Sequence, residues 1–347
     1  MRGRACAVVL AGMLAVAPVL VTAPAAVAQE VPAPETLCTV RDAKLAELSG
    51  LAADGDRWYA MGDGGTKLQV VVLGRDCGTQ KVISASVDPY DVEDLARAKD
   101  GTLWLADTGD NRKQRETVAL HALTPAGKAT LYRLTYPDGQ HDAEALLLDG
   151  SGTPFVVTKN VLGKAEVYKP AAELKSPGPN ALEKVGSLDI STTDTPGGPV
   201  GGVGSMLVTG GAVSPDGKTV ALRTYTDAYL YPAPDGDVAA ALKRNPVRVP
   251  LPNEPQGEAI AFEPDGTLLS ASEGTGQPVR AVRGAAALAV GATPAADEQE
   301  GSPGPTGDPA TGGSESPVPL LPAAAIAVLA ALGLVFVVSR VWRARRG

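Results

Sequence analysis

Histidine, cysteine and aromatic residues are scarce in this chain. Its 347 residues include two His and three Cys, and Phe, Trp and Tyr together make up only 4%. With His121 and His141 alone available, a metal site built from several histidines is nearly excluded. The Gly-x-Ser-x-Gly elbow, the phosphate-binding loop and His-rich metal motifs are also missing, so the usual signatures of hydrolases, nucleotide-binding proteins and zinc enzymes are lacking.

Glycine and proline are plentiful instead. The 40 Gly and 29 Pro make up about a fifth of the chain, above the usual share of roughly 12% but below the roughly 25–30% typical of low-complexity sequences. The glycines keep no period of three, which excludes collagen, and both residues are spread throughout, which excludes a long coiled coil. Because 44% of the residues are hydrophobic, we expect a folded core with many turns.

The first 28 residues have the pattern of a secretory signal peptide. Arg2 and Arg4 precede an apolar run over 5–21, and Ala26-Val27-Ala28 places small residues at a cleavage position. The alternative, an uncleaved membrane anchor, needs a longer apolar stretch. We therefore predict export and removal of residues 1–28.

A second apolar segment lies near the other end. Residues 318–339 carry no charge, and four arginines follow within 340–347. This segment is long enough for one membrane-spanning helix, and the basic cluster predicts a cytoplasmic tail. A buried core helix is the weaker alternative, because the segment has no polar face. The prediction is a single-pass protein of the cell membrane with an extracytoplasmic N-terminal ectodomain.

Residues 292–317 consist almost wholly of Ala, Pro, Gly, Ser, Thr, Asp and Glu, which predicts a disordered stalk. Within it, Asp308-Pro309-Ala310-Thr311-Gly312 resembles the Leu-Pro-x-Thr-Gly sorting signal of sortase substrates on Gram-positive bacteria. Asp308 stands where that family has Leu. Recognition by a sortase and a coincidence of stalk composition both remain open.

The predicted ectodomain is acidic and has two cysteines. Setting aside Arg2, Arg4 and the four tail arginines leaves 25 basic and 39 acidic residues, a net charge of −14. Nucleic acid is therefore excluded as an expected partner. Cys38 and Cys77 are an exported pair, which favours a disulfide over two free thiols.

One phrase recurs along the ectodomain: a short apolar strand, a Gly-containing turn and a second apolar strand. Four of the turns are Asp-Gly dipeptides, which suit tight hairpins. A strand at 36–40 has no unit before it, and one at 278–282 has no partner after it, so pairing the two would close a ring. The phrases begin at Ser49, Glu93, Glu144, Thr209 and Glu258, at intervals of 44, 51, 65 and 49 residues.

These intervals suit one four-stranded sheet per unit, so we predict an all-β fold of the β-propeller type with five blades. Six blades are the alternative, because the interval of 65 residues is long. Ser214-Pro215-Asp216-Gly217-Lys218 and Glu263-Pro264-Asp265-Gly266-Thr267 match the hairpin phrase of bacterial extracytoplasmic β-propellers of the WD40-like, NHL and YVTN types. Gln256-Gly257-Glu258-Ala259-Ile260-Ala261 more loosely resembles the esterase-like phytase family. The resemblance implies a propeller over 36–291 and no particular activity.

In a propeller the first strand of each blade lines a central channel, and residues two apart on it face the same way. Acidic residues occupy such positions, and further polar residues end the second strands. If these positions converge, several carboxylates would share one end of the channel. The predicted channel-mouth residues are Asp91, Glu93, Asp107, Asp142, Glu144, Lys159, Arg223, Glu258 and Glu273.

Three interpretations of this group compete. Its oxygens could bind Ca²⁺ or Mg²⁺; an Asp or Glu could act as a base while Lys159 and Arg223 hold an anionic phosphate ester; or the acids could simply cap loops. Asp107, Asp110 and Asn111 are a weak metal candidate, since the stretch resembles part of a calcium loop but lacks its terminal Glu. A loop that caps its own backbone is the favoured alternative.

The two histidines have structural interpretations as well. His121 alternates with apolar residues and is expected to be structural, and His141 is either a base at the mouth or a lone surface residue. No cofactor is assigned beyond Ca²⁺ or Mg²⁺ as candidates. The sequence favours a non-enzymatic binding or scaffold module for an envelope protein or small ligand. The alternative is an extracytoplasmic esterase- or phosphatase-type hydrolase that uses the channel carboxylates and a divalent cation.

Overall fold

A computed structural model describes residues 30–291 of the chain. The predicted signal peptide at 1–28, stalk at 292–317, membrane helix at 318–339 and basic tail at 340–347 lie outside the described residues. Within the described range, no helix is long and apolar enough to span a bilayer.

The described chain is mainly β-structure, arranged as five antiparallel groups of four strands, here called blades 1 to 5. Blade 1 is β2 (Leu48–Ala53), β3 (Trp58–Gly62), β4 (Leu68–Leu73) and β5 (Thr79–Ala85). Blade 2 is β6 (Asp94–Arg97), β7 (Leu103–Asp107), β8 (Val118–Leu123) and β9 (Ala129–Thr135). Blade 3 is β10 (Ala143–Leu148), β11 (Pro154–Thr158), β12 (Lys164–Pro170) and β13 (Asn180–Asp189).

The remaining strands form blades 4 and 5. Blade 4 is β14 (Val208–Val213), β15 (Thr219–Thr224), β16 (Asp227–Pro232) and β17 (Val247–Pro250). Blade 5 is β18 (Gly257–Phe262), β19 (Leu268–Ser272), β20 (Pro278–Val282) and β1 (Glu35–Thr39). The helices are short: η1 (Ala43–Leu45), η2 (Gly201–Met206), α1 (Val238–Ala241) and α2 (Ala285–Gly291).

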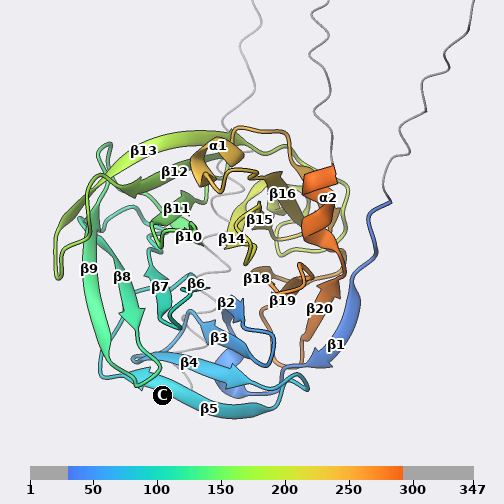
Figure 1. The fold of residues 1–347 in the computed structure, drawn as a ribbon, viewed down its shortest axis with the longest axis horizontal. Helices are drawn as coiled ribbons and strands as arrows, with labels where there is room; N and C mark the ends of the chain where they lie inside the picture. The colour runs from blue at the N-terminus through green and yellow to red at the C-terminus, as the bar shows by residue number, and fades with distance from the viewer. Residues whose placement is uncertain (1–29, 292–347) are drawn as a thin grey trace, which may run out of the picture. The chain divides into compact units, whose positions relative to one another are not determined.

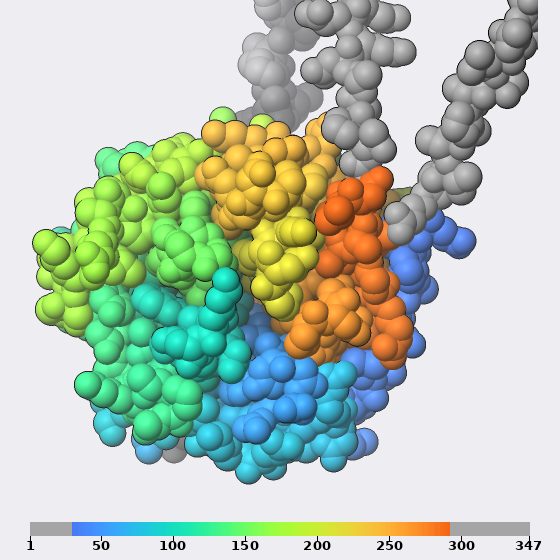
Figure 2. All heavy atoms as spheres, viewed as in Figure 1, coloured from blue at the N-terminus to red at the C-terminus, as the bar shows by residue number. Residues whose placement is uncertain are grey.

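The five blades stand around a common centre, the arrangement of a β-propeller (Figure 1). Their first strands, β2, β6, β10, β14 and β18, each contact the first strand of the next blade. Atoms of all five blades meet around the centre in the space-filling view (Figure 2). Blades 2 and 3 also join at their outer edges through a short parallel pairing of β13 with β9. The long interval that left six blades open is taken up by the ten-residue β13, a connecting loop and η2.

The ring closes as the sequence predicted. β1 pairs antiparallel with β20, so the N-terminal strand of the described chain completes blade 5. The predicted disulfide is present between Cys38 of β1 and Cys77 in the β4–β5 turn, with an S–S distance of 2.03 Å. A cross-link over 39 residues is worth about 4 kcal/mol in the chain-entropy model. It therefore holds the closing strand against blade 1.

Hydrophobic side chains fill the space between neighbouring blades. Among the described residues they form five clusters, one at each blade interface, and Leu95 and Met61 between blades 1 and 2 are typical members. Close packing of the inner strands demands small residues. A Cβ at Gly50 would lie 2.7 Å from the backbone nitrogen and Cβ of Leu95. Glycine there allows β2 and β6 to approach.

Candidate functional site

A β-bulge recurs near the start of the inner strands. In blades 1, 3, 4 and 5 the register with the second strand shifts across one residue. A bulge changes the direction of a side chain and is common next to binding sites. The residues at these shifts are Ser49, Glu144, Thr209 and Glu258, which are also starting residues of the recurring phrase.

The chemistry at this position differs between blades. Ser49 Oγ donates to the Glu93 carbonyl at 2.6 Å, and Thr209 Oγ1 donates to the Gly257 carbonyl at 2.8 Å. In blades 1 and 4 the small hydroxyl side chains therefore tie one inner strand to the start of another. In blades 2, 3 and 5 the corresponding residue is a glutamate.

Three buried carboxylates come together at the starts of β6 and β10. Glu93, Asp142 and Glu144 are only 5%, 6% and 2% exposed. One oxygen from each lies within 4.8 Å of the oxygens from the other two. The structure thus brings together three of the predicted channel-mouth residues, and we call Glu93, Asp142 and Glu144 the channel cluster.

Burial and mutual repulsion act strongly on the channel cluster. Burial, followed by repulsion from Glu144 and other acids, raises the pKa of Glu93 well above its usual value. Burial likewise raises the pKa of Glu144 well above normal, despite the opposing charge of Lys159. The pKa of Asp142 is raised by burial too. Burial and the closeness of these carboxylates thus make it costly for all three to be ionised together.

Lys159 is the predicted cation that does reach this cluster. Its Nζ lies 2.6 Å from Glu144 Oε1 and 5.2 Å from the centre of the Tyr225 ring. Burial lowers the pKa of Lys159, but Glu144 and neighbouring groups outweigh it and raise that pKa well above normal. Lys159 therefore stays charged and compensates one carboxylate.

Two further predicted acids continue the site into blade 5. The Gln256 side-chain amide donates to Glu258 Oε1 at 3.2 Å and also to Glu273 Oε1. Burial and the charge of Glu258 raise the pKa of Glu273 to about 11. Glu258 in turn contributes to the raised pKa of Glu144. The acids of blades 3 and 5 thus share one electrostatic environment.

The predicted polar residues near the ends of the second strands do not all occupy equivalent register positions. The backbone amide of Lys159 donates to the carbonyl of Asp142, and that of Glu273 donates to the carbonyl of Gln256. Asp142 and Gln256 each lie two residues before the bulge of their inner strand. In blade 2 the equivalent amide belongs to Gly109, which donates to the Asp91 carbonyl. In blade 4 the register places Tyr225 there. Asp107, the last residue of β7, and Arg223 in β15 lie two residues before these positions.

Asp107 orders the loop beside the channel. Its carboxylate accepts from the amides of Tyr90 and Asp91, from Arg115 at 2.9 Å and from His121 Nε2 at 3.2 Å. Burial raises its pKa, but these donors outweigh burial and lower it to about 2. His121 is 3% exposed, in keeping with the structural role expected of it.

Asp110 also serves the backbone. Its oxygens accept from the amides of Gln114 and Arg115, and its own amide donates to Asp142 Oδ1 at 2.7 Å. Asn111 is exposed. The metal site predicted at Asp107, Asp110 and Asn111 stays a prediction, and these contacts favour the alternative of a loop that caps itself.

Arg223 is fully buried in a network between blades 4 and 5. Its guanidinium donates to the carbonyls of Thr224, Tyr225, Ala259 and Ala271, and to Glu254 Oε2 at 2.7 Å. An arginine has five N–H groups, and these contacts use all of them. The predicted role of holding an anionic substrate therefore finds no support in its contacts.

Sequence reasoning missed Asp94, which follows Glu93 directly. Asp94 is fully buried and accepts from the amides of Leu95, Leu146 and Gly211 at 2.7, 2.7 and 3.0 Å. Burial raises the pKa of Asp94 well above normal while the three amides oppose that rise. Because β6 and β14 are not neighbours in the ring, its carboxylate links strands of three blades, β6, β10 and β14. The sequence feature that could have identified Asp94 is its position directly after Glu93 in the recurring phrase.

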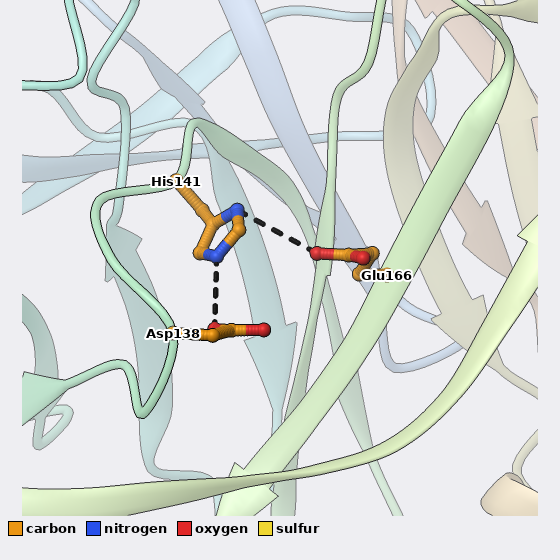
Figure 3. A group of neighbouring side chains, drawn as sticks. All are labelled: Asp138, His141 and Glu166. Carbon is orange, nitrogen blue, oxygen red and sulfur yellow. Dashed lines mark hydrogen bonds and ion pairs between the residues drawn. The ribbon is translucent and has the colours of Figure 1, made fainter.

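A second acidic group lies at His141. Its Nε2 is 3.0 Å from Asp138 Oδ1, and its Nδ1 is 3.7 Å from Glu166 Oε2 (Figure 3). Asp138 and Glu166 were not predicted as site residues. His141 is therefore not a lone surface residue; its partners are Asp138, Glu166 and Tyr168 and lie outside the channel cluster.

Comparisons with known proteins yield distant structural matches. No protein-family model matches the chain, and no curated protein matches it. Among solved structures, a gluconolactonase from Xanthomonas campestris matches at 16% identity and a TM-score of 0.40, covering 68% of this chain and 72% of its own. A streptogramin B lyase matches at 12% identity and a TM-score of 0.40, covering 70% of this chain and 96% of its own. A PQQ-bound aldose sugar dehydrogenase from Streptomyces coelicolor matches at 12% identity and a TM-score of 0.40, covering 74% of this chain and 99% of its own. Likenesses at this level assign neither a family nor an activity.

Proposed function

We propose that this chain is a cell-surface, membrane-tethered β-propeller that acts as a binding module, and that its channel mouth binds a hard divalent cation, Ca²⁺ or Mg²⁺. The observation that carries the proposal is the channel cluster, in which three buried carboxylates place oxygens within 4.8 Å of one another. The ligand or envelope partner of the module would bind over or beside this cation.

The physical argument is one of charge balance. Like charges in a poorly solvated site raise one another's pKa or require a counter-ion, and Lys159 compensates one carboxylate at Glu144. The channel cluster offers only carboxylate oxygens, which suit Ca²⁺ and Mg²⁺ better than softer metals. A bound cation would allow all three acids to ionise at neutral pH.

The location rests on the sequence and on the disulfide. Residues 1–28 and 318–339 have the patterns of a signal peptide and a membrane span. The Cys38–Cys77 disulfide suits an oxidising, extracytoplasmic compartment. We place the described domain outside the membrane, tethered through the stalk.

The alternative function is an extracytoplasmic hydrolase of esterase or phosphatase type. Glu93 favours it, because a buried carboxyl with a raised pKa can donate a proton at neutral pH. In that case a divalent cation would orient the substrate and Glu93 would act as general acid. Arg223 would take no part, since its five donors are used within the protein.

The test is a Ca²⁺ titration of the full chain in mild detergent, followed by calorimetry and by the melting temperature with and without chelator. We expect Ca²⁺ to raise the melting temperature, and Glu93→Gln to weaken Ca²⁺ binding about tenfold or more. In chelator the same variant should melt higher than the parent, because it removes an acid whose ionisation is opposed by burial and by the neighbouring carboxylates. This reversal of sign separates a cation ligand from a merely structural acid.

Glu183→Gln is the matched control, because Glu183 is exposed and pairs with Lys169 on the outer part of blade 3. It should leave Ca²⁺ binding unchanged. Absence of a Ca²⁺ or Mg²⁺ effect, or an equal effect of both variants, would overturn the cation proposal. Turnover in an ester and phosphoester panel that disappears in Glu93→Gln would favour the hydrolase.

A further inference from the structure

The cluster around His141 has the composition of a different kind of site. Asp138 and His141 lie in the connection between β9 and β10, and Glu166 lies on β12 (Figure 3). One ligand atom from each lies within 4.8 Å of those from the other two. A connecting loop and a strand thus together supply one imidazole and two carboxylates. We call Asp138, His141 and Glu166 the outer cluster.

Tyr168 marks the point where the ligand atoms of the outer cluster meet. It is two residues after Glu166 on β12, so both side chains face the same way. Its hydroxyl lies 2.8 Å from Glu166 Oε2, 3.0 Å from Asp138 Oδ1 and 3.1 Å from His141 Nε2. A hydroxyl has one proton to donate, so it cannot serve all of these atoms as acceptors at once.

We propose that the outer cluster binds a divalent transition metal, with Zn²⁺ as the reference ion. An imidazole nitrogen combined with carboxylate oxygens is a ligand set that Zn²⁺ accepts and that Ca²⁺ and Mg²⁺ do not favour. Three protein ligands would leave a coordination position for water, or for the Tyr168 hydroxyl. This metal differs in class from the cation proposed for the channel, and the inference does not depend on that proposal.

The outer cluster is accessible to an ion from solution. The side chains of His141, Glu166 and Asp138 are 17%, 19% and 40% exposed. Both carboxylates are ionised at neutral pH: burial raises the pKa of Asp138, but hydrogen bonds from His141 and Tyr168 outweigh it and lower that pKa. The pKa of Glu166 is lowered in the same way, chiefly by Lys184 and Tyr168 against burial.

Lys184 is the competitor that a metal must displace. Its Nζ contacts Glu166 Oε1 and lies 3.9 Å from Asp138 Oδ2. It lies on β13, the strand next to Glu166, and its side chain is 38% exposed. Such a lysine can turn into water at small cost. A metal ion and the Lys184 ammonium would therefore compete for the same two carboxylates, so that removing Lys184 should favour the metal.

The experiment titrates the full chain in detergent with Zn²⁺ by calorimetry, and with Co²⁺ by visible absorption. His141→Gln and Glu166→Gln should weaken Zn²⁺ binding by about 10- to 100-fold and remove the Co²⁺ absorption of an imidazole-ligated site. Lys184→Met should tighten Zn²⁺ binding about two- to fivefold, the size of an exposed ion pair. A purely structural cluster gives no reason for tightening.

Two controls keep the outcomes separate. Glu183→Gln, beside Lys184 in sequence, should leave Zn²⁺ binding unchanged, and Glu93→Gln should affect Ca²⁺ binding without affecting Zn²⁺. Melting temperatures in chelator show whether each variant folds. The proposal is overturned if His141→Gln keeps the Zn²⁺ affinity, if Lys184→Met binds no tighter, or if Glu93→Gln removes the Zn²⁺ signal, which would place the metal in the channel.

Discussion

The channel cluster and the outer cluster each hold three side chains of types that can ligate a metal, yet their environments differ in almost every respect. The channel cluster is buried, offers only oxygen atoms as ligands and lies at the starts of β6 and β10. The outer cluster is partly exposed, includes a nitrogen and has Lys184 and Tyr168 as hydrogen-bond donors. Acidic residues in similar numbers therefore form two chemically different sites.

The pKa shifts show what this difference means. In the channel cluster, burial and repulsion raise the pKa values of the acids. In the outer cluster, hydrogen bonds and a lysine outweigh burial and lower those of Asp138 and Glu166. In the outer cluster Lys184 already opposes the carboxylate charge, and a metal would have to displace it. In the channel cluster burial and repulsion oppose ionisation of the acids, and a bound cation would favour it.

Removing Asp94 should have the largest effect on this comparison. In Asp94→Ala the buried amides of Leu146 and Gly211 lose their acceptor, at about 1–3 kcal/mol each. We expect the free energy of unfolding to fall by about 3 kcal/mol or more in denaturant titrations. Ca²⁺ binding should weaken because β6 and β10 lose a common anchor, whereas Zn²⁺ binding should persist. Asp94→Asn retains one oxygen and should lose less. A loss below about 1 kcal/mol in Asp94→Ala would contradict the anchoring role.

The pH dependence of stability should separate the clusters next. Because folding raises the pKa values of Glu93 and Glu144 above the usual 4.5, the folded state binds more protons, and stability falls as pH rises above 4.5. The slope is about 1.4 kcal/mol per pH unit for each extra proton bound. We expect the chelated protein to melt higher at pH 5 than at pH 7, and both Ca²⁺ and Glu93→Gln to reduce that difference.

Asp107 supplies the opposite sign and acts as an internal control. Its folded pKa of about 2 lies below the usual 3.8, so its stabilisation is complete above 3.8 and is lost as pH falls through 2. In chelator, the melting temperature plotted against pH should therefore pass through a maximum near pH 4 to 5. A melting temperature that rises steadily from pH 5 to 7 in chelator would contradict the raised pKa values of Glu93 and Glu144.

A smaller effect is expected at the hydroxyl positions. Ser49→Ala removes the buried bond to the Glu93 carbonyl and should cost about 1–2 kcal/mol of unfolding free energy. It should also weaken Ca²⁺ binding slightly, because Glu93 is less firmly positioned. Thr209→Val removes the equivalent bond to Gly257, at similar cost in stability but with less effect on Ca²⁺. Equal Ca²⁺ effects in both variants would argue against positioning by Ser49.

Much of the fold could be predicted from local pattern. The recurring phrase located the inner strands because alternation and Asp-Gly turns are properties of short segments. The closing pair of β1 with β20 and the Cys38–Cys77 disulfide followed because an unpaired strand edge needs a partner and because two cysteines in a domain predicted to be exported favour a disulfide. The convergence of Glu93, Asp142 and Glu144 followed from the same repeat.

The sequence pattern did not resolve the register of the second strands. Asp107 and Arg223 were predicted at the channel mouth together with Lys159, but they lie two residues before the positions equivalent to Lys159, which Gly109 and Tyr225 occupy. Such a shift leaves the side-chain alternation unchanged along a strand, so a sequence pattern cannot reveal it. Arg223 instead reaches Glu254 inside the protein, a contact that depends on how blades 4 and 5 pack.

By itself the sequence determined the β-repeat, the ring closure, the disulfide and the acidic character of the channel, because each depends on residue type at a regular spacing. Only the tertiary structure decided which acids share a site, which carboxylate Lys159 neutralises, and that Asp138, His141 and Glu166 lie together. Those relations join residues of different strands and blades. Burial and distance in three dimensions, which set charge and ligand geometry, are not encoded in spacing along one chain.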